Sequence, residues 1–415
     1  WSKVTPAQRA KLLWRVADLI EAQAEELATL ETLDGGKLFG SVRNGEIPAA
    51  AESFRYYAGW CTKMEGRTPQ TSLPGMKFHA YTQREPIGVV AQIVPWNGPL
   101  VMAAWKLAPA LAAGCTCVFK PAEQTPMSTL LLGELFEQAG FPPGVVNIVT
   151  GDGKTGAALV EHPGVDKIAF TGSTEVGKFI MKTVVGTGKK YTLELGGKAA
   201  NILFDDAPVD QAVEGIVNGI FFNQGHVCCA GSRLFVQENI AENVISKLKE
   251  RMETLIVGDP LDKNTDIGAI NSKIQLDKIK MYVDIGQKEG GSIFQSPCSL
   301  PKMGYWHAPT LFTDVSQSHR IVQEEIFGPV LTVQTFRTAD EAIEKANNTP
   351  FGLAGGVWTD KGSKIFKVGK ALRSGVVWAN TYNKFDPTSP FGGYKESGVG
   401  REGGLHGLSA YLNLK

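Results

Sequence analysis

Two adjacent cysteines stand in a polar, glycine-rich stretch that could carry nucleophilic chemistry. Cys228 and Cys229 lie within NQGHVCCAGSR, residues 223–233. A thiol acts as a nucleophile when it is accessible and its thiolate is stabilised. The remaining cysteines fit structural roles better: Cys61, Cys115, Cys117 and Cys298. The local pattern therefore predicts a reactive thiol at Cys228 or Cys229 and does not choose between them.

Two other polar side chains stand in apolar surroundings. Glu194 ends an apolar run and precedes two glycines. Burial would raise its pKa towards the range useful for a general base, whereas an exposed strand end is the alternative interpretation. Asn97 lies in an apolar loop before Gly98 and Pro99. Its amide N–H could stabilise an oxyanion, or it could be an ordinary turn residue.

His226 offers a competing chemistry, because a cysteine–histidine pair would suggest a hydrolase. It lies only two residues from Cys228. Residues so close in sequence rarely face each other, and a hydrolase needs no nucleotide-binding fold. His226 is therefore a weak candidate.

Two glycine-containing turns could meet the phosphates of a dinucleotide. Residues 151–156 match G-x-G-x-x-G between an expected strand and a helix, but no clear ribose-binding acid follows about 20 residues on. Gly172 and Ser173 follow another expected strand and open a helix, where free N–H groups attract anions. We expect the second turn to be the better phosphate site, with a simple capped turn as the alternative.

An alternation of short apolar runs and helical stretches must position these residues. Such βα alternation predicts parallel sheets covered on both faces, with nucleotide sites at the carboxyl ends of the strands. The first expected series of strands is 87–94, 116–119, 145–149, 167–170, 191–195 and 201–204. A second series is 234–236, 330–336, 355–358 and 375–378. Residues 70–84 suggest an exposed hairpin, and residues 408–414 an edge strand.

Composition excludes several classes of protein. The 415 residues carry 42 basic and 42 acidic side chains, which argues against nucleic-acid binding. The longest apolar stretch is interrupted by proline and glycine, so no membrane span is expected. Six cysteines without a C-x-x-C pair predict neither a disulfide framework nor a metal site, and favour the cytoplasm. The chain starts at Trp1, so we expect the natural N-terminus, with any targeting segment, to be missing.

Seven blocks, in order along the whole chain, resemble the aldehyde dehydrogenase superfamily. They are PWNGPL (95–100), KPAEQTP (120–126), FTGSTEVG (170–177), LELGGK (193–198), FFNQG followed by CCAGSR (221–233), EEIFGPV (324–330) and SPFGGYKESG (389–398). The resemblance implies an α/β fold with three parts. These are a Rossmann-like NAD-binding domain at 1–67 and 87–196, an α/β catalytic domain at 197–399, and a β oligomerisation arm at 68–86 and 400–415. It also implies a homodimer or homotetramer.

The same resemblance assigns roles to residues. Cys228 becomes the nucleophile and Cys229 a neighbour without a chemical task. Glu194 becomes the general base, and Asn97 the oxyanion amide that works with the backbone N–H of Cys228. An aldehyde would then be oxidised to a carboxylic acid through a thiohemiacetal and a thioester, and base-activated water would hydrolyse the thioester.

NAD is the implied cofactor. Lys120 and Glu123 would hold the adenosine ribose, and a carboxylate there would repel the 2′-phosphate of NADP. The remaining implied cofactor contacts are Gly172, Ser173, Glu325, Phe327 and Trp96. The implied substrate tunnel is lined by Trp105, Val227, Phe385 and Phe391, which suggests an apolar substrate region.

Some positions depart from the family pattern. Gly98 replaces a frequent aromatic residue and implies a wider tunnel mouth, while the lack of a tunnel arginine disfavours a substrate with a second carboxylate. Leu405 stands where many relatives keep a glutamate, so a secondary proton path is expected to be absent. The chain's ending, with residues 385–387, is similar to a branch in which a second, degraded unit follows the first.

Two other functions remain to be weighed. A non-catalytic scaffold with this fold would have no need for the retained set of polar residues: Cys228, Glu194, Asn97, Lys120 and Glu325. A relative that passes the acyl group to coenzyme A would usually lack the base at Glu194.

Overall fold

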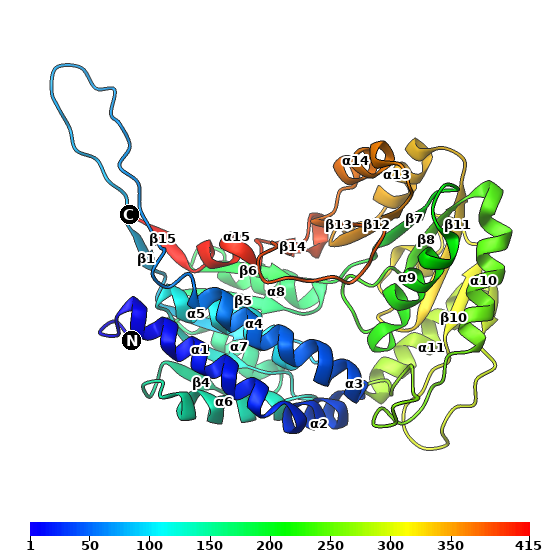
Figure 1. Cartoon of the computed structure of the whole chain (residues 1–415), viewed down its shortest axis with the longest axis horizontal. Helices are drawn as coiled ribbons and strands as arrows, with labels where there is room; N and C mark the ends of the chain where they lie inside the picture. Colours follow the sequence, from blue (N-terminus) through cyan, green and yellow to red (C-terminus); the bar gives the residue numbers. More distant parts are fainter.

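The computed structural model describes all 415 residues, from Trp1 to Lys415. Two α/β bodies lie side by side, each built on its own sheet, and a long loop projects from the first body (Figure 1). A third, two-stranded sheet lies at the base of that loop, next to the C-terminus. The α/β fold predicted from the sequence is confirmed.

The first body contains a six-stranded sheet. Its spatial order is β14 (Gly398–Val399), β6 (Lys190–Glu194), β5 (Lys167–Thr171), β2 (Val89–Ile93), β3 (Thr116–Lys120) and β4 (Val146–Ile148). All neighbours are parallel except β14, which runs antiparallel to β6. From β2 the chain therefore adds β3 and β4 on one side of the sheet. It then crosses back and adds β5 and β6 on the other side of β2.

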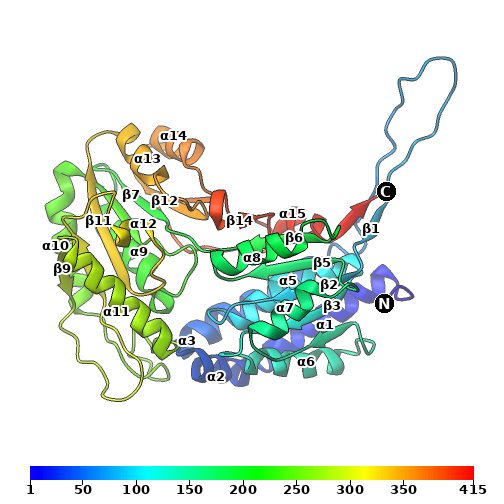
Figure 2. The same ribbon diagram turned by 180° about the vertical axis from the view of Figure 1, so that it is seen from behind.

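Helices cover both faces of this sheet, so its strands are apolar on both sides. One core joins the sheet to α1 (Pro6–Ala22), α2 (Ala24–Gly35), α4 (Ile47–Ala58), α5 (Pro99–Ala113) and α6 (Met127–Ala139). A short helix, α3 (Phe39–Ser41), and a π-helical turn (Val42–Glu46) lead into α4. A smaller core holds α7 (Gly153–Glu161) and α8 (Thr174–Val184) against the opposite face, which is turned to the viewer in Figure 2.

The second body contains a seven-stranded sheet. Its spatial order is β13 (Val376–Ala379), β12 (Ala354–Trp358), β7 (Ala200–Leu203), β8 (Arg233–Gln237), β11 (Val330–Phe336), β10 (Thr310–Thr313) and β9 (Ser292–Gln295). Only β9, at one edge, is antiparallel. The strands β9 and β10 were not predicted, because neither short run stands out by hydrophobic pattern.

Helices again lie on both faces. One core packs α9 (Val209–Phe221) and α10 (Ala241–Glu253) against the sheet. Two others hold α13 (Ala339–Asn347) with α14 (Gly362–Ala371), and α11 (Lys273–Lys288) with α12 (Arg320–Gln323). The helix α9 matters most for the site, because it ends directly before the turn that leads to the two cysteines.

One strand belongs to a different sheet from the one expected. Residues 201–204 were grouped with the first series, yet β7 pairs with β12 and β8 in the second sheet. The grouping was wrong because local patterns do not reveal which sheet a strand joins. The chain passes from the first sheet to the second between Glu194 and Ala200.

The predictions of an exposed hairpin at 70–84 and an edge strand at 408–414 were only partly right. Residues 70–83 form no paired hairpin; the legs of the loop meet where the Thr82 N–H donates to the Arg67 carbonyl at 2.8 Å. A two-stranded ribbon without a surface to pack on is marginal in water, which explains the missing ladder. The terminal strand is shorter than expected, since α15 (Gly404–Ser409) precedes β15 (Leu412–Leu414), which pairs with β1 (Arg84–Pro86).

The packing of α9 on its sheet can be tested at Gly215. A Cβ atom there would lie 2.1 Å from Cη2 of Trp358, whose side chain is fully buried. We expect Gly215→Val to destabilise the protein by about 1–3 kcal/mol through overpacking and to lower its melting temperature. The matched control is Gly369→Val, at an exposed position of α14 with no atom within 4 Å. Equal melting temperatures for the two variants would contradict the packing described.

Candidate active site at the carboxyl edge of the first sheet

Half of the predicted site residues lie where parallel strands of the first sheet end. Asn97 follows β2, Lys120 ends β3, Gly172 follows β5 and Glu194 ends β6. The strands β2 and β5 are neighbours from which the chain builds in opposite directions. Ligands bind at such a switch point in open α/β sheets, because loops diverge there and leave room.

The cysteines come from the second body, on a turn with unusual backbone. Asn223, Gln224 and Gly225 have φ values of 49°, 57° and 74°. At Gly225 a Cβ would lie 2.2 Å from the carbonyl oxygen of Gly328, so only glycine fits. The Gln224 side chain holds the turn by donating to the carbonyls of Gly36 and Ala269, at 2.9 and 2.8 Å. The strained conformation is thus fixed by contacts with both bodies.

Hydrogen bonds join Asn97 to this turn. The Asn97 Nδ2 donates to the carbonyl of His226 at 2.9 Å, and the Asn223 Nδ2 donates to the carbonyl of Asn97 at 3.0 Å. No backbone carbonyl accepts a hydrogen bond from the N–H of Cys228. The Asn97 amide and the free backbone N–H of Cys228 therefore both lie where the Asn97 loop contacts the cysteine turn.

The imidazole of His226 belongs to the wall of the site. Its ring stacks near Phe327, with centroids 5.9 Å apart, and meets Trp96 edge to face at 4.8 Å. Burial lowers the pKa of His226 to about 3, so the ring is neutral. The geometry gives no support to a cysteine–histidine hydrolase, for which the ring would have to meet a thiol.

The structure distinguishes the two thiols by accessibility. Cys228 is half-buried, whereas Cys229 is buried, with its Sγ 3.7 Å from the Asn383 side-chain oxygen. A hydrogen bond with the Cys229 thiol, together with burial, raises the pKa of Cys228. The Cys228 thiol is therefore protonated at rest, and its use as a nucleophile requires a base.

Glu194 is a buried carboxyl group of the kind that can serve as a general base for water. Its side chain is buried, and neither carboxyl oxygen has a hydrogen-bond partner in the protein. Burial, and then the negative charge of Glu402, raise the pKa of Glu194, while Lys106 and Arg401 oppose the shift. Its Oε1 would lie 2.8 Å from a Cβ at Gly392, so that glycine leaves room for the carboxyl group.

A buried ion pair next to Glu194 was missed in the sequence. Glu402 pairs with Lys106, and both side chains are almost completely buried. The expectation drawn from Leu405 stays a prediction: Leu405 is exposed on α15, whereas the carboxylate of Glu402, three residues earlier, is buried. Lys106 could have been noticed, since it is the only charged residue in α5.

The adenosine-side candidates lie together on the first body. The ammonium of Lys120 is 3.6 Å from the Glu123 carboxylate and donates to the carbonyl of Pro121. Ser173 caps α8 by accepting from the Val176 N–H at 3.3 Å. The rejected glycine motif is near: a Cβ at Gly156 would lie 3.8 Å from Cδ of Lys120. A buried lysine, a glycine beside it and the capped start of α8 are groups that suit a phosphorylated nucleoside.

Glu325 and its neighbours form the wall of the site that belongs to the second body. The Glu325 Oε1 accepts from the Gly197 N–H at 2.9 Å. A Cβ at Gly196 would lie 2.4 Å from Glu325 Oε2, so this glycine admits the carboxylate. Phe327 has φ 58° and meets Trp96 at 5.4 Å, edge to face. The structure thus brings the predicted nicotinamide-side residues into contact.

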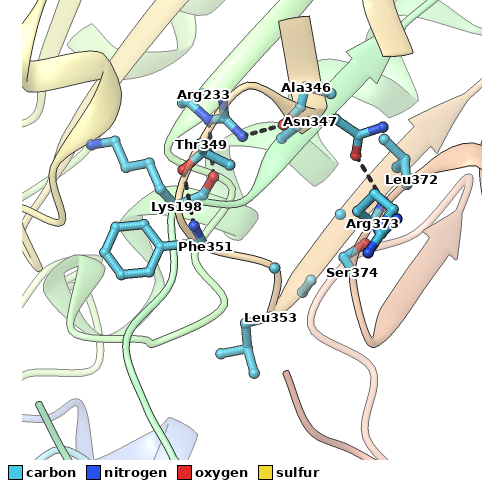
Figure 3. Close-up of a pocket in the computed structure, with 14 residues that line it drawn as sticks. Lys198, Arg233, Ala346, Asn347, Thr349, Phe351, Leu353, Leu372, Arg373 and Ser374 are labelled. Atoms are coloured by element: carbon cyan, nitrogen blue, oxygen red, sulfur yellow. Dashed lines mark hydrogen bonds between the residues drawn. The ribbon is translucent and has the colours of Figure 1, made fainter. Parts of the chain in front are cut away.

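A second buried lysine, Lys198, lies behind this wall and was not predicted. It lines a cavity of about 20 Å³ together with Arg233, and the two side chains diverge (Figure 3). Arg233 donates to three carbonyls, among them that of Ala346 at 2.7 Å. Burial and the charge of Arg233 lower the pKa of Lys198 to about 7, and Glu325 opposes the shift.

Three of the residues predicted to line the substrate tunnel also contact one another. The Trp105 ring lies 6.0 Å from Phe385 and 5.6 Å from Phe391, and the last two rings are 5.6 Å apart. Val227 packs against the same core as Trp105 and Cys228. These side chains form an apolar aromatic surface beside the thiol.

No group of three or more His, Cys, Asp or Glu side chains is placed to hold a metal ion. None of the helices combines the length and apolar character needed to cross a membrane.

Comparisons with known proteins agree with this geometry. The model of the aldehyde dehydrogenase family matches residues 1–415. The DhaS protein of Bacillus subtilis is 50% identical, over 100% of this chain and 83% of its own length. Retinal dehydrogenase 2 of Homo sapiens is 47% identical, over 100% of this chain and 80% of its length. The structure of the NAD+ complex of aldehyde dehydrogenase from Bacillus cereus is 47% identical and covers 100% of this chain and 84% of that one, with a TM-score of 0.97. The chain is therefore a member of the aldehyde dehydrogenase family.

Proposed function

We propose that the protein oxidises an aldehyde to a carboxylic acid with NAD, through a covalent intermediate on Cys228. The observation that carries the proposal is the meeting of three groups: an accessible thiol, the Asn97 amide and the buried carboxyl group of Glu194. Each group answers one need of the reaction, namely a nucleophile, an oxyanion donor and a base.

The first step is attack by Cys228 on the aldehyde carbon. A base removes the thiol proton, and the new carbon–sulfur bond places negative charge on the former carbonyl oxygen. The Asn97 Nδ2–H and the Cys228 N–H stabilise this charge, since both lie at the cysteine turn. When bound, NAD supplies the acceptor for the hydride that leaves the carbon.

The second step is hydrolysis of the resulting thioester. Glu194 takes a proton from water, the water oxygen adds to the acyl carbon, and the carbon–sulfur bond breaks to release the acid. The proton can then pass towards the Glu402–Lys106 pair, whose charges act on Glu194. A coenzyme A-acylating reaction is disfavoured, because it would have no use for this buried base.

The residues present fit NAD. Lys120, Glu123 and Ser173 would hold its adenosine and phosphates, and Glu325 would hold the nicotinamide ribose, with Trp96 and Phe327 nearby. The capped N-terminus of α8 favours an anion. The exposed Glu123 carboxylate next to Lys120 would repel a 2′-phosphate, so NAD should be preferred over NADP. The NAD+ complex of the Bacillus cereus aldehyde dehydrogenase supports this choice.

A scaffold without activity is the second candidate, and Glu194 argues against it. A buried carboxyl group without a partner costs stability, by about 1–3 kcal/mol per unsatisfied group. Such a cost is expected at a reacting centre and has no purpose in a scaffold.

We further propose a homodimer or homotetramer that acts in the cytoplasm. The projecting loop exposes Leu73, Met76, Phe78 and Tyr81, and an apolar surface of this kind suits pairing with a second copy. The six free cysteines favour a reducing compartment.

Replacing the thiols separately tests the nucleophile. We expect Cys228→Ser to lower aldehyde-dependent formation of reduced NAD by about a thousandfold or more, because the nucleophile is lost. Cys229→Ser is the matched control and should keep most of the activity, since the Cys229 thiol is buried. Activity retained in the first variant and lost in the second would reverse the assignment.

The raised pKa of Glu194 predicts a pH dependence. The carboxyl group accepts a proton only when ionised, so steady-state turnover should rise as the pH increases through the raised pKa. In Glu194→Gln we expect turnover to fall by about a hundredfold and this pH dependence to disappear. Stopped-flow absorbance should still show an initial burst of reduced cofactor, because the first step can proceed. An unchanged pH profile in the variant would exclude Glu194 as the base.

A further inference from the structure

We infer that the enzyme prefers uncharged aldehydes that carry an aromatic ring close to the carbonyl group. The inference rests on the proposed function and names the substrate class of the same site. It depends on the space beside Asn97 and on the surface that continues outward from that space.

The space is created by Gly98, which directly follows Asn97. Gly98 is buried, yet a Cβ placed on it would meet only one atom within 4 Å beyond its chain neighbours, the Cγ of Met102 at 3.8 Å. Its φ of −154° is available to any residue, so the backbone does not demand glycine here. Unfilled space next to the oxyanion amide can therefore receive the group attached to the aldehyde carbon.

One face of α5 continues this space. Gly98, Met102 and Trp105 follow at intervals of four and three residues, which places them on one side of the helix. Met102 and Trp105 are both half-buried, so this side is neither sealed in the core nor fully exposed. The wall that begins at the Asn97 loop is consequently apolar along two turns of helix.

Aromatic rings complete the wall. Trp105, Phe385 and Phe391 meet in pairs at 5.6–6.0 Å with interplanar angles of 66–68°. Trp378 adds an edge-to-face contact with Phe385 at 5.6 Å. Edge-to-face packing is the geometry in which aromatic rings gain energy beyond burial of area, so a substrate ring would extend an arrangement already present.

Exposure along this surface shows where a substrate would enter. Phe385 is 45% exposed and Phe391 is 8% exposed, while Cys228 and Val227 are half-buried next to the core that holds Trp105. The aromatic surface is thus open to solvent at Phe385, and its buried end packs on the core that Cys228 also contacts. None of these residues is charged, and the neighbouring Asp386 turns back to bond Thr388 at its own loop. The wall itself thus holds no cation that could pair with a substrate carboxylate, and the neighbouring Lys384 is exposed to solvent.

The test compares kcat/KM for three probes: benzaldehyde, propanal and 4-oxobutanoate. In the wild-type protein with NAD, we expect benzaldehyde to exceed each of the other two by about tenfold or more. In Gly98→Phe the new ring would fill the space, so kcat/KM for benzaldehyde should fall by about tenfold or more while that for propanal changes less than about threefold.

The matched control is Gly369→Phe, the same change at an exposed position with no atom within 4 Å, which should alter no ratio. Equal losses for benzaldehyde and propanal in Gly98→Phe, or a wild-type preference for propanal or 4-oxobutanoate, would overturn the inference and leave the proposed function standing. A folded wild-type protein that binds NAD and oxidises none of the three probes would overturn both.

Discussion

The hydrogen bonds between the Asn97 loop and the Asn223–His226 turn hold the two halves of the site together. One partner follows a strand of the first sheet, and the other follows a helix of the second body. The turn can offer its carbonyl and amide groups only because three successive residues adopt left-handed backbone. Such strain persists where surrounding contacts determine it, and the Gln224 side chain supplies two of them. The position of the thiol relative to the oxyanion amide follows from this contact.

Buried charge is the second constraint on the site. Lys106, Glu402 and Glu194 are all removed from water, and isolated ions in such surroundings would be strongly unfavourable. Pairing satisfies Lys106 and Glu402, whereas Glu194 remains without a partner in the protein. The cost of the unpartnered group is compensated by cores on both faces of the sheet that it ends. Burial and the charge of Glu402 raise the pKa of a carboxyl group held in this way, which makes it a better proton acceptor.

Much of the fold followed from local pattern, and the exceptions have physical reasons. The strand at 330–336 was predicted with its observed bounds, since β-branched and aromatic residues make up most of it. The sheet to which 201–204 belongs, and the missing pairing within 70–83, depend on contacts distant in the chain. The suggestion that a second, degraded unit follows in a longer protein, and the assigned domain limits, stay predictions.

The site residues, too, were only partly predictable from local pattern. Glu194 and Asn97 could be suspected because they are polar residues in apolar runs. Local pattern did not distinguish Cys228 from Cys229. The resemblance to the aldehyde dehydrogenases chose Cys228, and the structure agrees, because only Cys229 is fully buried. Glu402 was missed because a carboxylate near a chain end carries no local sign that it will be buried against Lys106. Spacing in the sequence can indicate reactive residues within one helix, strand or loop. It does not indicate which residues from distant parts of the chain will contact them.

The central claim is that a thioester forms on Cys228 and that Glu194 governs its release. The most direct measurement is intact-protein mass spectrometry of Glu194→Gln, quenched with acid shortly after mixing with NAD and benzaldehyde. The account predicts a mass increase of one benzoyl group per chain, located by peptide mapping at Cys228 and absent without NAD. An acyl group mapped to Cys229 would contradict it. So would a burst of reduced NAD without any acyl-protein.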